Sequence, residues 1–535
     1  DKEGKNPIYL FDYTPSFSSF GIVPRIVSLL PDEPDEILMT AVDSDDPGLG
    51  LWRVNVETGK EERIYQGEQG VYSISVNEKG EPVFKVRSNS RNTVFRTYAS
   101  ADGGKSWTHI HEEVLSGIVN EPAQFVPVAP LGGNKHIVIM QPEGEDRMGL
   151  YEYDLNTLRP TQKIFSHGEV DVTGAFINPY TGAYRGVSYW VDKRDTELSD
   201  PTENAVMDML EKHFGDKLSV SLINTTERGD KWLILAHGPE NPGQYFLFSP
   251  QKGALEPLFL KRPALAGRTS PMEIIRTPMS DGVVITSYVT HPKGAENKPA
   301  PLLVIPHGGP QARDYYDFDL FSQFFASRGY RVIQTNFRGS AGYGEAFVES
   351  GHREWGKRMQ ADVMESAMSL VDRGLAKKKN MCIFGWSYGG YVAMTASFKN
   401  ADMFSAAIST AGVSDLIKSI QSERQTAGGN PASYSYWTTS IGDPVDDRED
   451  LLANSAFRNV DKVAMPVLLF HGEDDYTVRV EQSRIFNNAL KRAGKPVEYH
   501  EYKDTGHGIV TWNDADIDFM FNRVDQFCRA NLPAQ

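Results

Sequence analysis

The chain has 535 residues, which at roughly 100 to 200 residues per domain allows about two to four domains and excludes a single small module. Apolar residues make up 40% and charged residues 24%, as in a folded globular protein, so the composition excludes a disordered or fibrous chain. The formal net charge is −16 and no basic stripe interrupts the acidic balance, which argues against a nucleic-acid partner.

Membrane and redox signals are sparse. No apolar run reaches about 18 residues, so we expect neither a transmembrane helix nor a membrane partner. The sequence begins with Asp1 and shows no signal-peptide pattern, so we expect that a segment upstream was removed. The location is left open. It is cytoplasmic or, if the removed segment was a signal peptide, periplasmic or secreted. Cys382 and Cys528 lack metal-ligand spacing, which predicts two buried thiols without a disulfide, and no metal or organic cofactor is implied.

Residues 30–262 read as short alternating strands separated by turns, with hardly any helical periodicity. An aromatic strand, a polar turn and a returning strand recur from Gly50, Gly149 and Gly243, about two propeller blades of 40 to 50 residues apart. Intermediate copies are expected at 93–98 and 184–190. The pattern predicts an all-β propeller over residues 1–262 with about five four-stranded blades visible. An irregular sandwich of two stacked sheets is the alternative.

After Pro263, apolar strands alternate with helices of helical apolar spacing. This pattern predicts an α/β domain over 263–535 with a doubly wound, mostly parallel sheet covered on both faces. The expected strands are 302–306, 331–336, 381–384, 406–409, 466–470 and 497–502, and the expected helices are 356–372, 388–398, 480–493 and 516–530.

Gly385-Trp386-Ser387-Tyr388-Gly389 is the G-x-S-x-G sequence of the chain, and it stands between an expected strand and an expected helix. This context is typical of the nucleophile elbow of an α/β-hydrolase. The tight turn needs small residues and presents Ser387 Oγ at the sheet edge. We therefore predict Ser387 as the nucleophile, against the alternative of a structural serine in a tight turn.

A serine hydroxyl needs an imidazole to take its proton and a carboxylate to orient that imidazole. In this fold the chain order is serine, acid, histidine. His507 follows the last strand and has the right order, whereas His307 precedes the nucleophile and His471 adjoins a bend at Gly472. Three acids follow that bend, and periodicity does not choose among them: Glu473, Asp474 and Asp475.

Residues 265–530 resemble the catalytic domain of the prolyl oligopeptidase family of serine peptidases, especially its acylaminoacyl-peptidase branch. The motifs that carry the resemblance are His307-Gly308-Gly309-Pro310, the run from Asn336 to Gly344, Gly385 to Tyr391, His471 to Asp475 with Val478, and Gly506-His507-Gly508. The resemblance implies that the acid is Asp475, the fifth residue of the His-Gly motif.

The backbone N–H of Tyr388, the residue after the nucleophile, is the expected first oxyanion donor. In the dipeptidyl-peptidase and prolyl-oligopeptidase branches a tyrosine hydroxyl occupies the position of His307 and serves as the second. This chain departs from that pattern. The resemblance to the acylaminoacyl branch implies a backbone N–H of Gly308 or Gly309 instead.

Aromatic residues crowd the expected specificity region, and an apolar substrate pocket follows if they converge. They are Trp386, Tyr391, Tyr434, Tyr436 and Trp437, with core packing as the alternative. The family often carries an arginine two residues after the acid. Thr477 stands there and Arg479 lies two further on, so Arg479 is a candidate substrate contact. No helical glutamate pair like that of dipeptidyl peptidases is evident.

These features predict a serine peptidase that acts on short peptides, with the propeller limiting substrate size. An esterase or amidase acting on non-peptide acyl compounds is the alternative, because the same triad serves both. An inert scaffold is disfavoured because all triad positions are filled. Self-association is left open.

The resemblance also implies seven blades, two more than the five visible. We therefore expect that the propeller lacks an N-terminal segment and that the strand read at 8–13 ends something longer.

Overall fold

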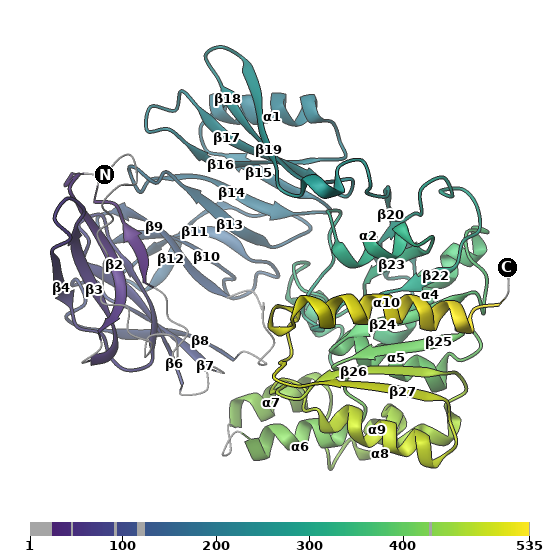
Figure 1. Cartoon of the computed structure of the whole chain (residues 1–535). Helices are drawn as coiled ribbons and strands as arrows, with labels where there is room; N and C mark the ends of the chain where they lie inside the picture. The colour runs from purple at the N-terminus through teal and green to yellow at the C-terminus, as the bar shows by residue number, and fades with distance from the viewer. Residues whose placement is uncertain are drawn as a thin grey trace. The chain divides into compact units, whose positions relative to one another are not determined.

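A computed structural model describes residues 24–533 except 31, 44–45, 90–93, 115–123 and 427–430. The strand read at 8–13 lies outside the described residues. The chain divides into two compact units (Figure 1). The first comprises Asp1–Leu115, Pro122–Tyr189 and Thr196–Val206, and the second comprises Ser116–Glu121, Trp190–Asp195 and Met207–Gln535.

Four consecutive antiparallel sheets fall in the first part of the chain, each built from strands adjacent in sequence. They are β1 (Arg25–Ser28), β2 (Glu36–Asp43), β3 (Asp46–Asn55) and β4 (Glu61–Tyr65); β5 (Val71–Val76), β6 (Pro82–Ser88), β7 (Val94–Ala99) and β8 (Thr108–Val114); β9 (Phe125–Gly132), β10 (Lys135–Met140), β11 (Gly149–Asp154) and β12 (Arg159–Phe165); and β13 (Val172–Ile177), β14 (Tyr184–Trp190) and β15 (Arg194–Leu198).

A fifth antiparallel sheet belongs to the second unit and contains β16 (Ser219–Thr225), β17 (Trp232–Gly238), β18 (Asn241–Ser249) and β19 (Ala254–Leu260). The described residues up to 262 therefore form the five small sheets that the sequence predicts, and not two stacked ones. The repeats at Gly50, Gly149 and Gly243 fall in β3, β11 and β18, the third strand of their sheets.

The expected copy at 184–190 is wrong by one strand. Residues 184–190 form β14, the second strand of its sheet, whereas β15 holds the third place. The next element in chain order after β15 is a helix, α1 (Pro201–Phe214), and not the returning strand that completes the other sheets. Asp200 caps this helix by accepting hydrogen bonds from the N–H groups of Thr202 and Glu203 at 2.8 and 3.0 Å. The cap redirects the chain into a helix that alternation alone does not predict.

Consecutive sheets of the first unit pack against each other through apolar faces, as propeller blades do. Val42 and Leu49 of the first sheet join Val71 and Ile74 of the second. The second and third sheets share a further core, and so do the third and fourth. These cores include Phe84 with Val138 and Tyr153, and Ile139 with Val172 and Val187.

The second unit also contains an eight-stranded sheet with the order β20-β21-β23-β22-β24-β25-β26-β27. Neighbouring strands from β23 to β27 are parallel, and the hairpin β20–β21 joins the sheet antiparallel. The strands are β20 (Met272–Pro278), β21 (Val284–Thr290), β22 (Leu302–Val304), β23 (Arg331–Asn336), β24 (Met381–Trp386), β25 (Ala406–Thr410), β26 (Val467–Gly472) and β27 (Val497–Tyr502). All six predicted strands are present, and the hairpin is an addition.

Helices cover both faces of this sheet, which confirms the doubly wound prediction. The helices are α2 (Leu320–Ser327), α3 (Glu345–Glu349), α4 (Arg358–Asp372), α5 (Tyr388–Lys399), α6 (Leu416–Thr426), α7 (Pro431–Ser440), α8 (Arg448–Ala453), α9 (Glu481–Arg492) and α10 (Asp514–Asn531), with 3-10 turns at Pro263–Leu265, Ala456–Lys462 and Ile509–Thr511. The four predicted helices correspond to α4, α5, α9 and α10. The described helices include none that is both long and apolar enough to cross a membrane.

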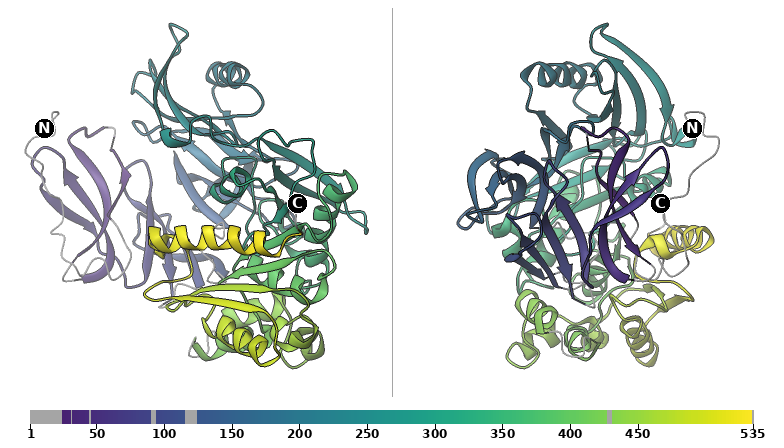
Figure 2. Two further views of the ribbon diagram at one scale, coloured as in Figure 1. Left: turned by 45° about the vertical axis from the view of Figure 1, so that its right-hand side comes forward. Right: turned by 90° about the vertical axis from the view of Figure 1, so that its left-hand side faces the viewer.

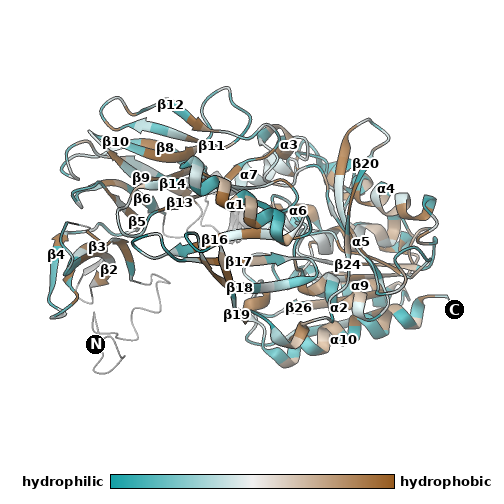
Figure 3. Cartoon of the chain, turned by 90° about the horizontal axis from the view of Figure 1, so that it is seen from above, coloured by the Kyte–Doolittle hydropathy of each residue, from teal (hydrophilic) through white to brown (hydrophobic). Residues whose placement is uncertain are grey.

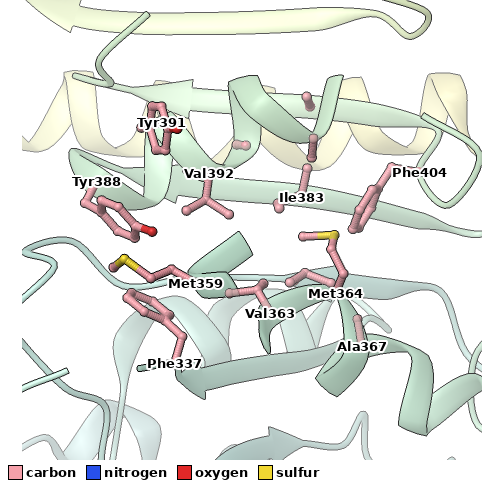
Figure 4. Close-up of a cluster of buried hydrophobic side chains, with 14 of the residues drawn as sticks. Phe337, Met359, Val363, Met364, Ala367, Ile383, Tyr388, Tyr391, Val392 and Phe404 are labelled. Atoms are coloured by element: carbon pink, nitrogen blue, oxygen red, sulfur yellow. The ribbon is translucent and has the colours of Figure 1, made fainter. Parts of the chain in front are cut away.

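The two faces differ in the strand residues that they use. On one face Leu303 and Phe384 pack with Phe325 of α2 and Phe521 of α10, the yellow helix of Figure 2. Helix α10 shows both hydrophilic and hydrophobic colours in Figure 3, as expected for a helix with one buried side. On the other face α4 and α5 pack on the alternate residues of the same strands, with Ile383 at the centre (Figure 4). Cys382 and Cys528 are buried and free, as predicted.

Candidate active site

Ser387 lies at the sharp turn between β24 and α5. Its φ of 58° and ψ of −118° place it in a strained backbone region that few non-glycine residues adopt. Glycines make the turn sterically allowed, because a β-carbon at Gly385 would lie 2.1 Å from the carbonyl oxygen of Gly389. One at Gly389 would lie 2.1 Å from the carbonyl oxygen of Pro306. The elbow predicted from the sequence is therefore present with its strain.

Of the three candidate acids after β26, Asp475 is the one that is buried. Asp474 and Glu473 are exposed, whereas Asp475 is 2% exposed. Its Oδ1 accepts hydrogen bonds from the N–H groups of Thr477 and Val478 at 2.9 and 2.8 Å. Burial alone would raise the pKa of Asp475, but hydrogen bonds from two histidines outweigh it and lower the pKa to about 2. The carboxylate is therefore ionised at neutral pH.

His507 follows β27 and lies within reach of that carboxylate. Its Nδ1 is 2.6 Å from Asp475 Oδ2, which leaves Nε2 as the nitrogen able to take a proton. The indole Nε1 of Trp386 donates to the backbone carbonyl of His507 at 2.9 Å. Trp512 Nε1 donates to the carbonyl of Gly506 at 3.1 Å. The histidine loop is thus tied directly to the residue before Ser387.

His471 also contacts the acid, which the sequence reasoning missed. It is fully buried, and its Nε2 lies 2.8 Å from the carbonyl oxygen of Val478 and 3.3 Å from Asp475 Oδ2. Its Nδ1 lies 2.7 Å from the hydroxyl of Ser483. His471 therefore supports the acid from inside the protein. The signal in the sequence is its place four residues before Asp475 at the end of a buried strand.

Two backbone segments with the predicted oxyanion donors lie next to Ser387. The N–H of Tyr388 opens α5, where the first N–H groups of a helix have no intrahelical acceptor. The loop after β22 passes next to Ser387, because a β-carbon at Gly308 would lie 3.5 Å from the Ser387 β-carbon and 3.3 Å from the Trp386 carbonyl oxygen. Gly309 follows with a φ of +116°.

The predicted aromatic residues separate into two groups. Tyr391, Tyr434 and Trp437 pack in the core that also contains Tyr388 (Figure 4 shows the two core tyrosines). Trp355, which the sequence reasoning missed, lies at the centre of this group, with ring centroids 4.5 Å from Tyr388, 5.1 Å from Tyr391 and 6.1 Å from Trp437. Tyr391 is fully buried and donates its hydroxyl proton to the carbonyl of Asn454 at 3.0 Å.

The remaining candidates lie elsewhere. Tyr436 contacts the ring of Trp437 at 5.1 Å. Trp386 packs on the opposite face of the sheet, against Trp512 at 5.0 Å. The guanidinium of Arg479 lies 5.4 Å from the ring centroid of Tyr476, beside the acid. Tyr476 is 75% exposed.

A second serine–histidine–aspartate arrangement occurs in the same unit. His237 Nδ1 lies 2.9 Å from Asp317 and its Nε2 lies 3.4 Å from Ser221 Oγ. Ser221 is fully buried within β16 and follows no elbow, so no substrate carbonyl can reach it. This arrangement joins the fifth sheet to the segment before α2. In the ranges that the structure describes, no three His, Cys, Asp or Glu side chains gather as metal ligands.

Residues 316–532 match the family model described as the prolyl oligopeptidase family. This part of the chain belongs to the prolyl oligopeptidase family. The family match contains Ser387, Asp475 and His507, and the β22 loop with Gly308 and Gly309 immediately precedes it.

Curated relatives of this chain include proteins named as peptidases. Dipeptidyl aminopeptidase BIII of Pseudoxanthomonas mexicana is 28% identical over 394 residues, which cover 70% of this chain and 55% of that protein. The acylamino-acid-releasing enzyme of Mus musculus is 25% identical over 214 residues, 39% of this chain and 29% of that protein. The chain spans about half the length of the curated relatives that it matches first.

Solved structures confirm a propeller and an α/β-hydrolase domain as the fold of this chain. A Mycobacterium tuberculosis puromycin-hydrolyzing peptidase superposes with a TM-score of 0.68 at 22% identity, covering 94% of this chain and 78% of that one. The Pyrococcus horikoshii acylaminoacyl peptidase superposes with a TM-score of 0.65 at 18% identity, covering 96% and 88%.

Proposed function

We propose that the chain is a serine peptidase that hydrolyses short peptides through an acyl-enzyme intermediate, with residues 263–535 as the catalytic domain. The observation that carries this proposal is the linkage of the strained Ser387 to a buried acid. Trp386, directly before Ser387, holds the backbone of His507, and His507 Nδ1 lies 2.6 Å from Asp475. Nucleophilic serine chemistry requires a base that is oriented by a third group, and His507 with Asp475 supplies that pair beside Ser387.

The geometry supports a two-step reaction. Ser387 Oγ attacks the substrate carbonyl carbon while His507 Nε2 takes the hydroxyl proton, and Asp475 stabilises the imidazolium that forms. The N–H of Tyr388 and an N–H of the Gly308–Gly309 pair stabilise the negative charge on the carbonyl oxygen. The imidazolium then gives its proton to the leaving amine as the carbon–nitrogen bond breaks. Water attacks the ester in the second step by the same route and frees Ser387.

Peptides are the proposed substrates because one relative is named a dipeptidyl aminopeptidase and another an acylamino-acid-releasing enzyme. One neighbouring solved structure is an acylaminoacyl peptidase in complex with Z-Gly-Gly-Phe-chloromethyl ketone, a short peptide blocked at its N-terminus.

The test is a panel of short chromogenic peptides with blocked and free N-termini, set beside p-nitrophenyl esters of simple acids. We expect turnover of peptides, labelling of the protein by a serine-directed fluorophosphonate, and loss of both in Ser387→Ala. Ester hydrolysis without any peptide hydrolysis would overturn the peptidase proposal in favour of an esterase. Absence of labelling in the unsubstituted chain would contradict any serine hydrolase.

We further propose that the propeller restricts access to small substrates. Peptides of about ten residues should be cleaved, whereas folded proteins and casein should resist. Gel electrophoresis of casein digests, run beside mass spectrometry of the peptide digests under the same conditions, checks this expectation. Casein cleavage at a rate comparable to that of the peptide would contradict it.

A further inference from the structure

Two apolar side chains are exposed on the loops that carry the acid and the histidine. Val510 is 92% exposed and Tyr476 is 75% exposed, two of the three highest values among the large apolar side chains that the structure describes. Tyr476 directly follows Asp475, and Val510 lies three residues after His507. Single exposed apolar residues are ordinary on a protein surface, so it is the position of this pair, and not exposure alone, that needs an explanation.

The two loops lie side by side at the carboxyl ends of β26 and β27. The N–H of Asp474 donates to the carbonyl of Thr505 at 3.0 Å. A β-carbon at Gly472 would lie 2.2 Å from the same carbonyl oxygen, so the two segments are in close contact. The 2.6 Å bond between Asp475 and His507 joins them again further along. The segments that carry the two exposed side chains therefore leave the sheet together.

Val510 is held in its exposed place by a closed turn. It is the middle residue of the 3-10 turn Ile509–Thr511. The hydroxyl of Thr511 accepts a hydrogen bond from the N–H of Gly506 at 3.0 Å and donates to the carbonyl of Gly508 at 2.7 Å. Ile509 packs against the core that contains α10. The loop thus buries a neighbour of Val510 and leaves the Val510 side chain in solvent.

Tyr476 lies on a turn that is anchored by the acid itself. Asp475 Oδ1 accepts from the N–H groups of Thr477 and Val478 at 2.9 and 2.8 Å, which closes the backbone around Tyr476. Val478 is buried, and the guanidinium of Arg479 lies 5.4 Å from the ring centroid of Tyr476. The backbone is therefore fixed, while the ring stays exposed.

The chemistry of the proposed reaction assigns an occupant to this surface. The imidazolium of His507 gives its proton to the leaving amine, so that amine must come within hydrogen-bond reach of His507 Nε2. The amine belongs to the residue after the cleaved bond, and the side chain of that residue therefore lies next to the histidine loop. The oxyanion donors come instead from the start of α5 and from the loop after β22, which follow other strands of the sheet.

We propose that Val510 and Tyr476 are specificity residues that contact the substrate side chain directly after the cleaved bond and favour an apolar one. The assignment rests on the proposed function and names the part of the substrate that these two loops recognise. Both side chains act by removing apolar surface of the leaving residue from water. Neither takes part in proton transfer.

Acyl transfer to an added amine measures this subsite by itself. The full chain is acylated with the p-nitrophenyl ester of a blocked amino acid, which releases p-nitrophenol. Water or an amino-acid amide then attacks the ester carbonyl carbon, His507 Nε2 takes a proton from the attacking atom, the bond from carbon to Ser387 Oγ breaks, and the proton passes to Oγ. Attack by the amide is the reverse of acylation by a peptide, so the amide occupies the place of the leaving residue. Chromatography gives the ratio of amide product to acid product with equal concentrations of leucinamide or glycinamide.

The variants separate the two side chains from general surface effects. Val510→Thr keeps the shape of the side chain and replaces a methyl group by a hydroxyl. Tyr476→Ala removes the ring, and Tyr476→Phe keeps it. Val284→Ala is the matched control, because Val284 is 55% exposed on β21, six places from β27 in the strand order. The thermal midpoint of unfolding is measured for each variant.

We expect the unsubstituted chain to use leucinamide about 10-fold better than glycinamide, at the low end of what an apolar side chain contributes in a pocket, because this surface is open. Val510→Thr and Tyr476→Ala should each lower this preference about 2- to 5-fold. The rate of hydrolysis by water should change less than about two-fold. Tyr476→Phe and Val284→Ala should keep the preference, and the thermal midpoint should stay the same in all four variants, since exposed side chains contribute little to stability.

A preference below about two-fold in the unsubstituted chain, or no amide product at all, would overturn the inference. An unchanged preference in Val510→Thr or in Tyr476→Ala would exclude that residue, and an equal loss in Val284→Ala would exclude both. Failure of the unsubstituted chain to cleave peptides would refute the proposed function, while the product ratios from the ester would still decide the role of the two residues. Absence of acylation by the ester would refute both proposals.

Discussion

At the residue scale, the carboxylate of Asp475 is held by four donors: two backbone N–H groups and two imidazoles. Its pKa of about 2 keeps it ionised far below neutral pH, so protonation of this group does not limit the reaction in the range where histidines titrate. Asp474 is one residue away and exposed to solvent. The two aspartates therefore form a matched pair for substitution.

Substitution of the triad should abolish turnover without unfolding the chain. We expect Ser387→Ala, which removes the nucleophile, and His507→Ala, which removes the proton acceptor, to lower kcat by about 10⁴- to 10⁶-fold. Asp475→Asn should lower kcat by about 10⁴-fold, because the His507 imidazole then adopts the wrong tautomer. Asp474→Asn should keep kcat within about two-fold. Steady-state kinetics with one peptide check this, and a larger loss in Asp474→Asn than in Asp475→Asn would contradict the choice of acid.

At the element scale, α10 follows the loop that contains His507 and begins with a well-formed cap. Asn513 Oδ1 accepts a hydrogen bond from the N–H of Asp516 at 2.9 Å. The helix packs Met520 and Val524 against the sheet. The cap thus acts at the junction between the His507 loop and a helix that is anchored on the core.

Asn513→Ala should lower the free energy of unfolding by about 1 kcal/mol, because one N–H at the helix start loses its acceptor. Asn513→Ser is the matched control, since its hydroxyl can accept the same bond. Denaturant unfolding followed by circular dichroism measures the difference. An Asn513→Ala variant as stable as the unsubstituted chain, or a serine variant as unstable as the alanine one, would argue against the cap.

Some helices and strands of this chain can be predicted from sequence patterns, and others cannot. The helix α4 is predicted correctly because its apolar residues recur on one face. The short helix α2 is missed, since eight residues give too little periodicity, and the hairpin β20–β21 is missed because it pairs with β23, far along the chain. Propeller spacing predicts a strand where the chain forms α1, a helix whose start is stabilised by the Asp200 cap.

At the scale of the whole molecule, a buried cation joins several segments of the second unit. Arg331 is fully buried at the start of β23, and its Nε donates to Nδ1 of His291 at 3.0 Å. His291 Nε2 lies 3.1 Å from Glu273, which also pairs with Arg373 at 2.8 Å. The guanidinium of Arg331 further donates to the backbone carbonyls of Ala295, Glu296, Lys298 and Leu375.

This network predicts loss of stability in mild acid. Burial, with repulsion from Arg331, lowers the pKa of His291, and Glu273 opposes the shift only in part. The pKa of His291 in the folded chain lies below its unfolded value of about 6.5. The stabilisation that neutral His291 gives to the folded state is therefore complete above about pH 6.5, and it declines as the pH falls from there towards the folded pKa. Protonation also removes the acceptor that Arg331 Nε uses.

Thermal unfolding between pH 7.5 and pH 5 tests the role of His291. The midpoint should fall with pH in the unsubstituted chain and fall less in His291→Asn, whose amide oxygen can accept from Arg331 without titrating in this range. Matching slopes in the two proteins would show that other groups carry the acid sensitivity.

By itself, the sequence determined the fold class, the nucleophile candidate and the histidine candidate. These rest on patterns within short stretches: strand–glycine–serine–helix at Ser387, and a glycine-flanked histidine after the last strand at His507. The number of small sheets also followed from spacing along the chain. Local signals of this kind survive folding because strands, turns and helix starts are formed by residues close together in the sequence.

Only the tertiary structure decided which neighbours meet. Asp474 and Asp475 are chemically alike, and their difference is burial against His471 and His507. Trp386 and Tyr391 stand five residues apart, yet they pack on opposite faces of the sheet. The partners of His307 come from Gly308 and from Ser340, 33 residues away. Burial and hydrogen-bond direction depend on segments that the chain brings together from a distance, so no local pattern encodes them.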